Sequence, residues 1–229
     1  GKSDVVIVDV GGTVGDIECT PFLEAVRQCR NVFGKNNAVY IHVTLVPYIG
    51  VSGEQKTKPT QHSVKELRGL GVSPNVIVLR TDYPVDEETR NKVALFCNVE
   101  PDCVIEDSNV DILYEAPIML ERSNLTKIVS RELGLPDNEP DLRFWNEMLE
   151  KARNRKKIVT IGLVGKYVKM YDTYLSIVEA LTHGGIYNGA KIDLKWIDAE
   201  KVTRDSAAAE LGECDGIIVP GGFGDRGIE

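Results

Sequence analysis

The stretch Val39-Tyr-Ile-His-Val-Thr-Leu-Val46 is predicted to be a strand, because apolar and β-branched residues fill it. A segment of helical period follows at residues 60–70, and a second apolar run follows at 76–79. Strand, helix and strand in this order form a βαβ unit, whose strands lie parallel in one sheet. The sequence therefore predicts an α/β fold with a Rossmann-like, mainly parallel sheet.

The same alternation continues on both sides of this unit. Residues 5–10 are predicted to be a buried-type strand that ends at a glycine-rich turn, and a helix should run from about Thr20 to Gly34. Residues 86–96 resume the helical period after an acidic first turn, which suits the helix dipole. The later elements are predicted strands at 159–164, 192–197 and 216–219, with helices at 173–183 and near Ala207.

The composition changes between residues 135 and 157, where two prolines and several acidic residues precede a basic run. We interpret this change as a domain boundary, with a first domain at 1–142, a linker at 143–157 that is helical around Trp145, and a second domain at 158–229. A chain of 229 residues has room for two such domains. Only three strands of the second sheet are predicted, so we expect a piece of a longer protein.

Composition also narrows the range of partners. The chain is 42% hydrophobic, 27% charged and carries a net charge of −8, which argues against nucleic-acid binding. No apolar run approaches the roughly 20 residues that span a bilayer, so no membrane partner is expected. The five cysteines are scattered, which disfavours a disulfide framework or zinc site and suits a cytoplasmic protein. Small molecules and other subunits are the expected partners.

The run Ser52-Gly-Glu-Gln-Lys-Thr-Lys-Pro-Thr-Gln-His-Ser-Val64 is the strongest candidate binding site. Lys56 and Lys58 stand two apart in a segment expected to be extended, so both ammonium groups can point to one side, toward a polyphosphate. An isolated pair of this kind is more often a solvated basic turn. The acidic balance of the chain makes this cluster conspicuous.

Asp9 is expected at the carboxyl end of the first strand, the edge where parallel sheets bind ligands. A carboxylate there can hold Mg²⁺ on nucleotide phosphates, although a turn or helix-capping role is equally compatible. Asp16 and Glu18 offer two more acceptors ahead of a helix. Their alternatives are helix capping and recognition of ribose hydroxyls or a base amino group.

Several motifs together resemble the CTP synthase family. They include Val10-Gly-Gly-Thr-Val-Gly-Asp-Ile-Glu18, His42-Val-Thr-Leu-Val-Pro-Tyr48 and the lysine run continued to Leu67. Shorter matches follow in the family's order at 94–99, 162–167 and 219–227. The resemblance covers essentially the whole chain, and the first and third motifs are long enough to be specific.

The resemblance implies a P-loop amidoligase domain followed by the start of a class I glutamine amidotransferase domain. The implied activity is that of a glutamine-hydrolysing ligase, in which ATP phosphorylates O4 of UTP and ammonia from glutamine displaces the phosphate to give CTP. It further implies Mg²⁺ dependence, feedback inhibition by CTP, activation by GTP, a homotetramer and a place in pyrimidine nucleotide biosynthesis.

The resemblance also implies roles for individual residues. Asp9 stands where the family has a Mg²⁺ ligand that is usually Glu, and Gly222 lies in an oxyanion-type turn at 221–224 that contacts glutamine. Lys56 and Lys58 are implied to be catalytic as well as binding residues. The implied nucleotide contacts are Asp16, Ile17 and Glu18 for CTP; Lys56, Thr57, Lys58, Pro59, Thr60, Gln61 and Lys92 for both UTP and CTP; Arg80, Ser108, Asn109 and Val110 for ATP; and Lys166, Tyr167 and Arg226 near the GTP activator.

Two parts of the family's machinery have no counterpart in the sequence. It contains neither the phosphate-binding loop nor the glutaminase cysteine with its histidine and glutamate partners. The chain by itself is therefore expected to be inactive. Two alternatives stay open: an amidoligase of the cobyric acid synthase type, which the triphosphate-binding lysine run disfavours, and a non-catalytic nucleotide-binding module, which the start of a glutaminase domain disfavours.

Overall fold

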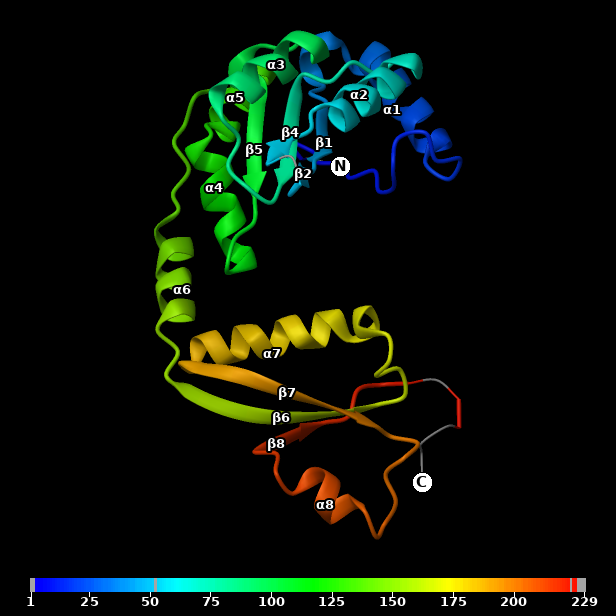
Figure 1. Cartoon of the computed structure of the whole chain (residues 1–229), viewed down its shortest axis with the longest axis vertical. Coiled ribbons are helices and arrows are strands. Elements are labelled where there is room, and N and C mark those ends of the chain that lie inside the picture. Colours follow the sequence, from blue (N-terminus) through cyan, green and yellow to red (C-terminus); the bar gives the residue numbers. More distant parts are fainter. Residues whose placement is uncertain (1–2, 52, 223, 226–229) are drawn as a thin grey trace. The chain divides into compact units, whose positions relative to one another are not determined.

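The computed structural model describes residues 3–51, 53–222 and 224–225, and Figure 1 shows the chain coloured along the sequence. The chain divides into two compact units, Gly1–Asp141 and Leu142–Glu229. No helix among the described residues has the length and apolar character needed to cross a membrane.

The sheet of the first unit contains β1 (Ile41–Val46), β4 (Val76–Thr81) and β5 (Val104–Ser108), in the spatial order β1-β4-β5. All neighbours are parallel, with Ile41 opposite Val76 and Ile77 opposite Val104. Crossover helices make such parallel pairing possible. The predicted parallel α/β sheet is confirmed.

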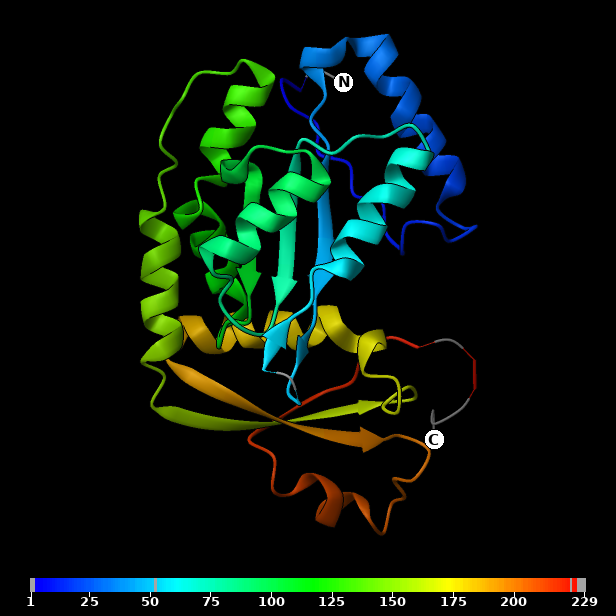
Figure 2. The ribbon, with the colours of Figure 1, turned by 45° about the horizontal axis from the view of Figure 1, so that its top comes forward.

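One face of this sheet is covered by α2 (Lys58–Gly69) and α3 (Glu87–Cys97), which lie over the strands in Figure 2. Val64 of α2 and Val93 of α3 pack with Ile77 and Leu79 of β4 in one buried cluster. The Asp86 carboxylate caps α3 by accepting a hydrogen bond from the amide of Thr89 at 2.7 Å. Such a cap satisfies one of the free N–H groups at a helix start.

The opposite face of the sheet is covered by α4 (Ala116–Arg122) and α5 (Leu125–Leu133). Ile128 of α5 packs against Val76, Val78 and Ile105, which point away from α2 and α3. Strand β4 is therefore buried on both faces. A separate cluster joins α1 (Thr20–Phe33) to α2 through Leu23 and Leu67.

The prediction of a strand at residues 5–10 is wrong, because the structure forms no regular secondary structure there. Ile7 is 91% exposed. A strand needs a backbone partner, and among the described strands β1 pairs with β4 alone. The outward face of β1, formed by Ile41, Val43 and Leu45, is likewise exposed.

The second unit has a parallel sheet in the order β7-β6-β8, with bounds Ala190–Asp198, Lys157–Gly165 and Gly216–Ile218. Helix α7 (Leu175–Tyr187) packs against β7. Gly185 permits this contact, because a Cβ there would lie 2.6 Å from the carbonyl oxygen of Ala190. The unit also contains α6 (Arg143–Arg153) and α8 (Ala207–Leu211).

The remaining elements are short. Strands β2 (Tyr48–Ile49) and β3 (Glu54–Gln55) form an antiparallel hairpin that precedes α2. The described 3-10 helices are η1 (Lys35–Asn37), η2 (Pro101–Cys103), η3 (Leu113–Glu115) and η4 (Tyr171–Tyr174).

His42 links β1 to α2 and should make the stability of the first unit depend on pH. Its Nε2 lies 2.8 Å from Ser63 Oγ, and burial lowers the pKa of His42 below its ordinary value of 6.5. The unfolded chain then binds this proton more tightly than the folded chain. The free energy of unfolding should therefore fall as pH drops below about 6.5, and level off below the folded-state pKa.

Urea unfolding of the first unit from about pH 8 to about pH 5 measures this dependence. His42→Gln should flatten the profile in this window. His62→Gln, a change at an exposed position of α2, is the matched control and should leave the profile unchanged. An unaltered profile in His42→Gln would contradict the prediction.

Candidate functional site

The candidate lysines surround the start of α2 rather than an extended loop. Lys56 follows β3, and its amide donates to the carbonyl of Pro47 at 2.9 Å. Lys58 is the first residue of α2, and Pro59 lies in the first turn, where its missing N–H costs no helical hydrogen bond. The predicted extended conformation is wrong at Lys58, because the helix begins there and not near Thr60.

The side chains of Lys56 and Lys92 act on one carboxylate. Lys56 Nζ lies 2.5 Å from Glu54 Oε2. The hydrogen bond from Lys56 lowers the pKa of Glu54 most, and the charge of Lys92 lowers it further. Glu54 is thus paired with Lys56, and the positive charge of Lys92 on α3 also acts on this carboxylate.

Lys58 reaches the same helix. Its Nζ lies 5.5 Å from the ring centroid of Phe96 and 3.3 Å from Gln61 Oε1. Phe96 and Lys92 are four residues apart on α3, so they share one side of that helix. Lys58 therefore lies on the side of α3 that carries Lys92, while Lys56 is paired with Glu54 in the segment that leads into α2. These positive charges can together bind a polyanion.

The threonines of the lysine run have structural contacts. Thr60 is fully buried, and its hydroxyl lies 3.0 Å from Thr44 Oγ1 and donates to the carbonyl of Leu45. Thr57 is also buried and accepts a hydrogen bond from Gln61 Nε2 at 3.1 Å. The bonds of Thr60 fix α2 against β1, and the bond of Thr57 closes the first turn of α2. Both hydroxyls thereby stabilise the segment that carries Lys56 and Lys58.

The carboxylates expected near the glycine-rich turn lie around one cavity of about 340 Å³. Asp9, Asp16 and Glu18 line it, together with Cys19 and Phe22. Ile17 does not line this cavity and is 87% exposed. Although residues 5–10 are not a strand, the turn still brings the three acidic residues together.

Hydrogen bonds within the turn set this arrangement. Asp16 Oδ2 accepts from the amide of Thr13 at 3.2 Å, and the buried thiol of Cys19 donates to the carbonyl of Asp16 at 3.1 Å. Gly12 and Gly15 have φ of 90° and 102°, a conformation that favours glycine. Side chains of the turn therefore stabilise its conformation. The Glu18 side chain is exposed.

The Asp9 carboxylate could bind a hard cation such as Mg²⁺ only together with oxygen atoms of a bound ligand. Among the residues that the structure describes, no group of three or more His, Cys, Asp or Glu could hold a metal ion. Mg²⁺ is commonly bound by one or two carboxylates together with substrate phosphates. The exposed Asp9 carboxylate fits this mode as a single protein ligand.

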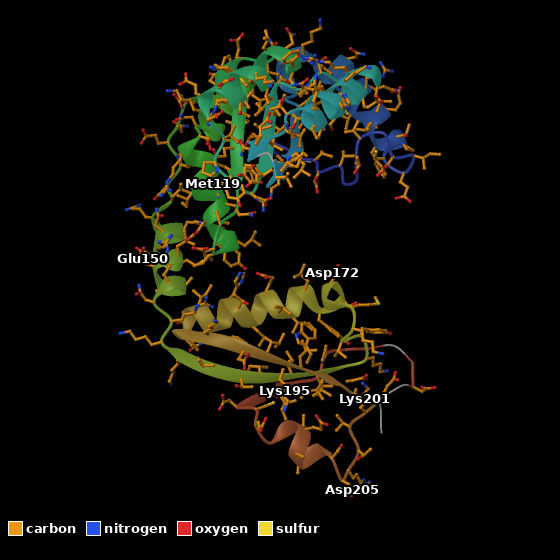
Figure 3. The ribbon with its side chains drawn as sticks, viewed as in Figure 1. Met119, Glu150, Asp172, Lys195, Lys201 and Asp205 are labelled. Atoms are coloured by element: carbon orange, nitrogen blue, oxygen red, sulfur yellow. The ribbon has the colours of Figure 1, made fainter. Side chains whose placement is uncertain are left out.

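The residues expected to contact ATP meet at the carboxyl ends of β4 and β5. Arg80 donates to the carbonyl of Asp107 at 3.0 Å and to Asn109 Oδ1 at 2.7 Å. Asn109 in turn donates to Asp82 Oδ1 at 3.0 Å. Ser108 Oγ lies 3.3 Å from Met119 Sδ, whose side chain is labelled in Figure 3.

Arg80, Asn109 and Ser108 therefore lie together, and the adjacent Val110 is half-buried. The carboxyl edge of a parallel sheet is the usual ligand-binding edge of such folds.

In the second unit, Lys166 binds the glycine-rich turn. Its Nζ donates to the carbonyl of Gly224 at 2.6 Å, and its side chain lies beside Gly222. The hydroxyl of the buried Tyr174 accepts from the amides of Lys166 and Tyr167 at 3.1 and 3.3 Å. Arg226 falls outside the described residues.

A family model described as CTP synthase N-terminus matches residues 1–135, more than half of the chain. The chain belongs to the CTP synthase family. A second model, glutamine amidotransferase class-I, matches residues 169–229. The resemblance seen in the sequence motifs is confirmed, as is the fold class of an α/β synthase domain followed by the start of an amidotransferase domain.

Individual members of the CTP synthase family are similar along the whole chain. Proteins named CTP synthase from Ruminiclostridium cellulolyticum and Geobacillus kaustophilus are 54% and 55% identical over 228 residues, which is 100% of this chain and 43% of each relative. One from Streptococcus pyogenes is 54% identical over 227 residues, or 99% of this chain and 42% of the relative. The chain thus spans less than half the length of these relatives.

Three residues that shape the candidate site were not predicted from the sequence. Glu54 holds Lys56, Phe96 lies under Lys58, and Gln55 joins the lysine segment to the end of β4. The sequence gives one signal for Phe96, since it follows Lys92 by one helical turn. Glu54 and Gln55 carry no such signal, because their contacts depend on the hairpin register.

Proposed function

We propose that the protein containing this chain makes CTP from UTP, with ATP as phosphoryl donor and glutamine as nitrogen source. The observation that carries the proposal is the placement of Lys58 on the Lys92 side of α3, with Lys56 in the segment that leads into α2, in a chain of the CTP synthase family. Three cations in these segments match the charge of a nucleoside triphosphate. In this proposal Glu54 holds Lys56 until phosphate oxygens replace its carboxylate.

The proposed reaction has two steps at the pyrimidine ring. The O4 oxygen of UTP attacks the γ-phosphorus of ATP, the proton on N3 of the uracil ring is lost, and ADP leaves. Ammonia from glutamine hydrolysis then attacks C4, a proton is lost, and inorganic phosphate leaves with the former O4. Lys56 and Lys58 hold the UTP triphosphate during both steps, so that the ring stays at a fixed place.

The other nucleotide roles are distributed over the sites described above. Asp16, Ile17 and Glu18 select CTP as feedback inhibitor. Asp9 holds Mg²⁺ together with phosphate oxygens, and the ion when bound neutralises phosphate charge. The further proposed contacts are Thr57, Pro59, Thr60 and Gln61 for the shared UTP and CTP site, and Arg80, Ser108, Asn109 and Val110 for the adenine of ATP.

The second unit is proposed to begin the glutaminase domain. Gly222 contacts glutamine in a turn whose backbone N–H groups stabilise the oxyanion. The contact of Lys166 with Gly224 supports this role, because it holds the turn. We further propose that GTP activates the protein, that it is a homotetramer, and that this chain is inactive by itself. The proposed domain boundaries are a synthetase domain at 1–142 and a linker at 143–157.

The direct test is CTP formation by the full-length protein from UTP, Mg²⁺-ATP and glutamine, followed by chromatography of the nucleotides. We expect CTP with glutamine and also with ammonia, and none without ATP. An intact protein that produces no CTP from either nitrogen source would refute the proposed function.

The role of Asp9 predicts a separation of the two activities. Asp9→Asn in the full-length protein should abolish Mg²⁺-ATP-dependent CTP synthesis while glutaminase activity largely remains, because only the first unit loses a charge. Asp4→Asn, in the same exposed segment, is the matched control and should retain both. Synthesis at near the parental rate in Asp9→Asn would show that this carboxylate holds no metal.

The division between shared and CTP-selective contacts predicts two different kinetic outcomes. Lys58→Ala should weaken UTP and CTP together, by tenfold or more, since a lost charge-assisted hydrogen bond costs about 1.5–3 kcal/mol. Glu18→Ala should raise the CTP inhibition constant and leave the apparent UTP affinity within about twofold.

Steady-state kinetics with CTP titrated at fixed UTP measure both effects. Lys65→Ala and Glu66→Ala, two exposed changes on α2, are the controls and should match the parent. Parallel losses of UTP and CTP affinity in Glu18→Ala would contradict the division.

A further inference from the structure

The side chain of Gln55 connects two segments that are far apart in the sequence. Its Nε2 lies 3.0 Å from Thr81 Oγ1, 2.9 Å from the carbonyl oxygen of Tyr83 and 3.3 Å from that of Pro84. Gln55 is the last residue of β3, and the three acceptors lie at the end of β4 and in its connection to α3. One amide therefore joins the hairpin to the connection between β4 and α3.

The connection that receives this amide is itself firmly held. Thr81 is 2% exposed, and its hydroxyl also donates to the carbonyl of Tyr83 at 3.1 Å. The amide of Val85 donates to Glu106 Oε2 on β5 at 2.8 Å. A fixed segment of this kind can hold the hairpin in one position through its hydrogen bonds with Gln55.

The hairpin, in contrast, has little to hold it by itself. Its strands are two residues long, and isolated two-stranded hairpins are marginally stable in water. An aromatic contact also joins it to the connection, with the ring centroids of Tyr48 and Tyr83 4.4 Å apart. The Gln55 amide and this ring contact therefore hold the hairpin against the connection between β4 and α3.

We propose that Gln55 is a positioning residue that sets the place of Lys56 relative to Lys92. Lys56 is the next residue along the chain, and Lys92 lies on the helix that follows the connection. Because Lys56 follows the hairpin and Lys92 belongs to α3, the link between the hairpin and the connection that leads into α3 sets the distance between the two ammonium groups, and with it how a triphosphate can be held. This inference rests on the proposed function, since it concerns UTP binding by those lysines.

The chemistry of the contact requires an amide. The Nε2 group has two N–H donors, and oxygen atoms at three positions face it. Methionine has a similar length and no donor, so Gln55→Met keeps the volume and removes the link. The acceptors left behind lose a partner, and the hairpin loses its attachment.

The test compares Gln55→Met with Gln28→Met in the full-length protein. Gln28 is an exposed residue of α1 whose amide donates to Glu24, so it provides a matched loss of one amide. We expect Gln55→Met to raise the KM for UTP roughly five- to tenfold, with kcat within about twofold. Glutaminase activity and the unfolding temperature of the variant should match those of Gln28→Met.

Two results would overturn the inference. The first is an unchanged KM for UTP in Gln55→Met while the parent makes CTP, which leaves the proposed function standing. The second is a parallel fall in UTP affinity, glutaminase activity and unfolding temperature, which would show a general structural role. A parent protein without CTP synthesis would instead refute the proposed function itself.

A double-mutant cycle with Thr81→Val gives an independent measurement. Valine has the shape of threonine without the hydroxyl that receives the Gln55 amide. If the link positions Lys56, the combined variant should raise the KM for UTP less than the product of the two single effects. Fully multiplicative effects would show that the two side chains act separately and would also overturn the inference.

Discussion

The burial of β4 on both faces is the constraint on which the first unit depends. Ile77 and Leu79 face α2 and α3, whereas Val76 and Val78 face α5. A shift of β4 by one residue would exchange the two sets of side chains and disturb the packing against both helix layers. The ends of β1, β4 and β5 are thereby fixed. Arg80 and Ser108 lie at the carboxyl ends of β4 and β5, and the candidate lysines lie in the segments that connect the strands.

The cationic side chains of the candidate site are held by short polar contacts with neighbouring residues. Lys56 is paired with Glu54, and Arg80 is paired with the Asp107 carbonyl and Asn109. Exposed pairs of this kind contribute little to stability and exchange readily with a better partner. A surface that already holds its cations in place loses less side-chain freedom when an anion arrives.

The sequence predicted the parallel sheets and most helices, because apolar runs and helical periods carry that information locally. The strand predicted from the apolar run at residues 5–10 is absent, because the described strands provide no partner for it. The candidate site was predicted as a set of residues. The partners of those residues were not, since Gln55 meets Thr81 and Lys58 meets Phe96 only after the sheet and helices are assembled.

The outer side of β1 has a consequence for how this chain behaves at high concentration. Ile41, Val43 and Leu45 form an exposed apolar row, and the strand has no described neighbour beyond β4. In the same unit, the apolar residues 5–8 are also exposed. An unprotected strand edge next to apolar side chains favours intermolecular pairing and, with it, aggregation. The colloidal stability of the chain should therefore be governed by one strand edge rather than by its net charge of −8.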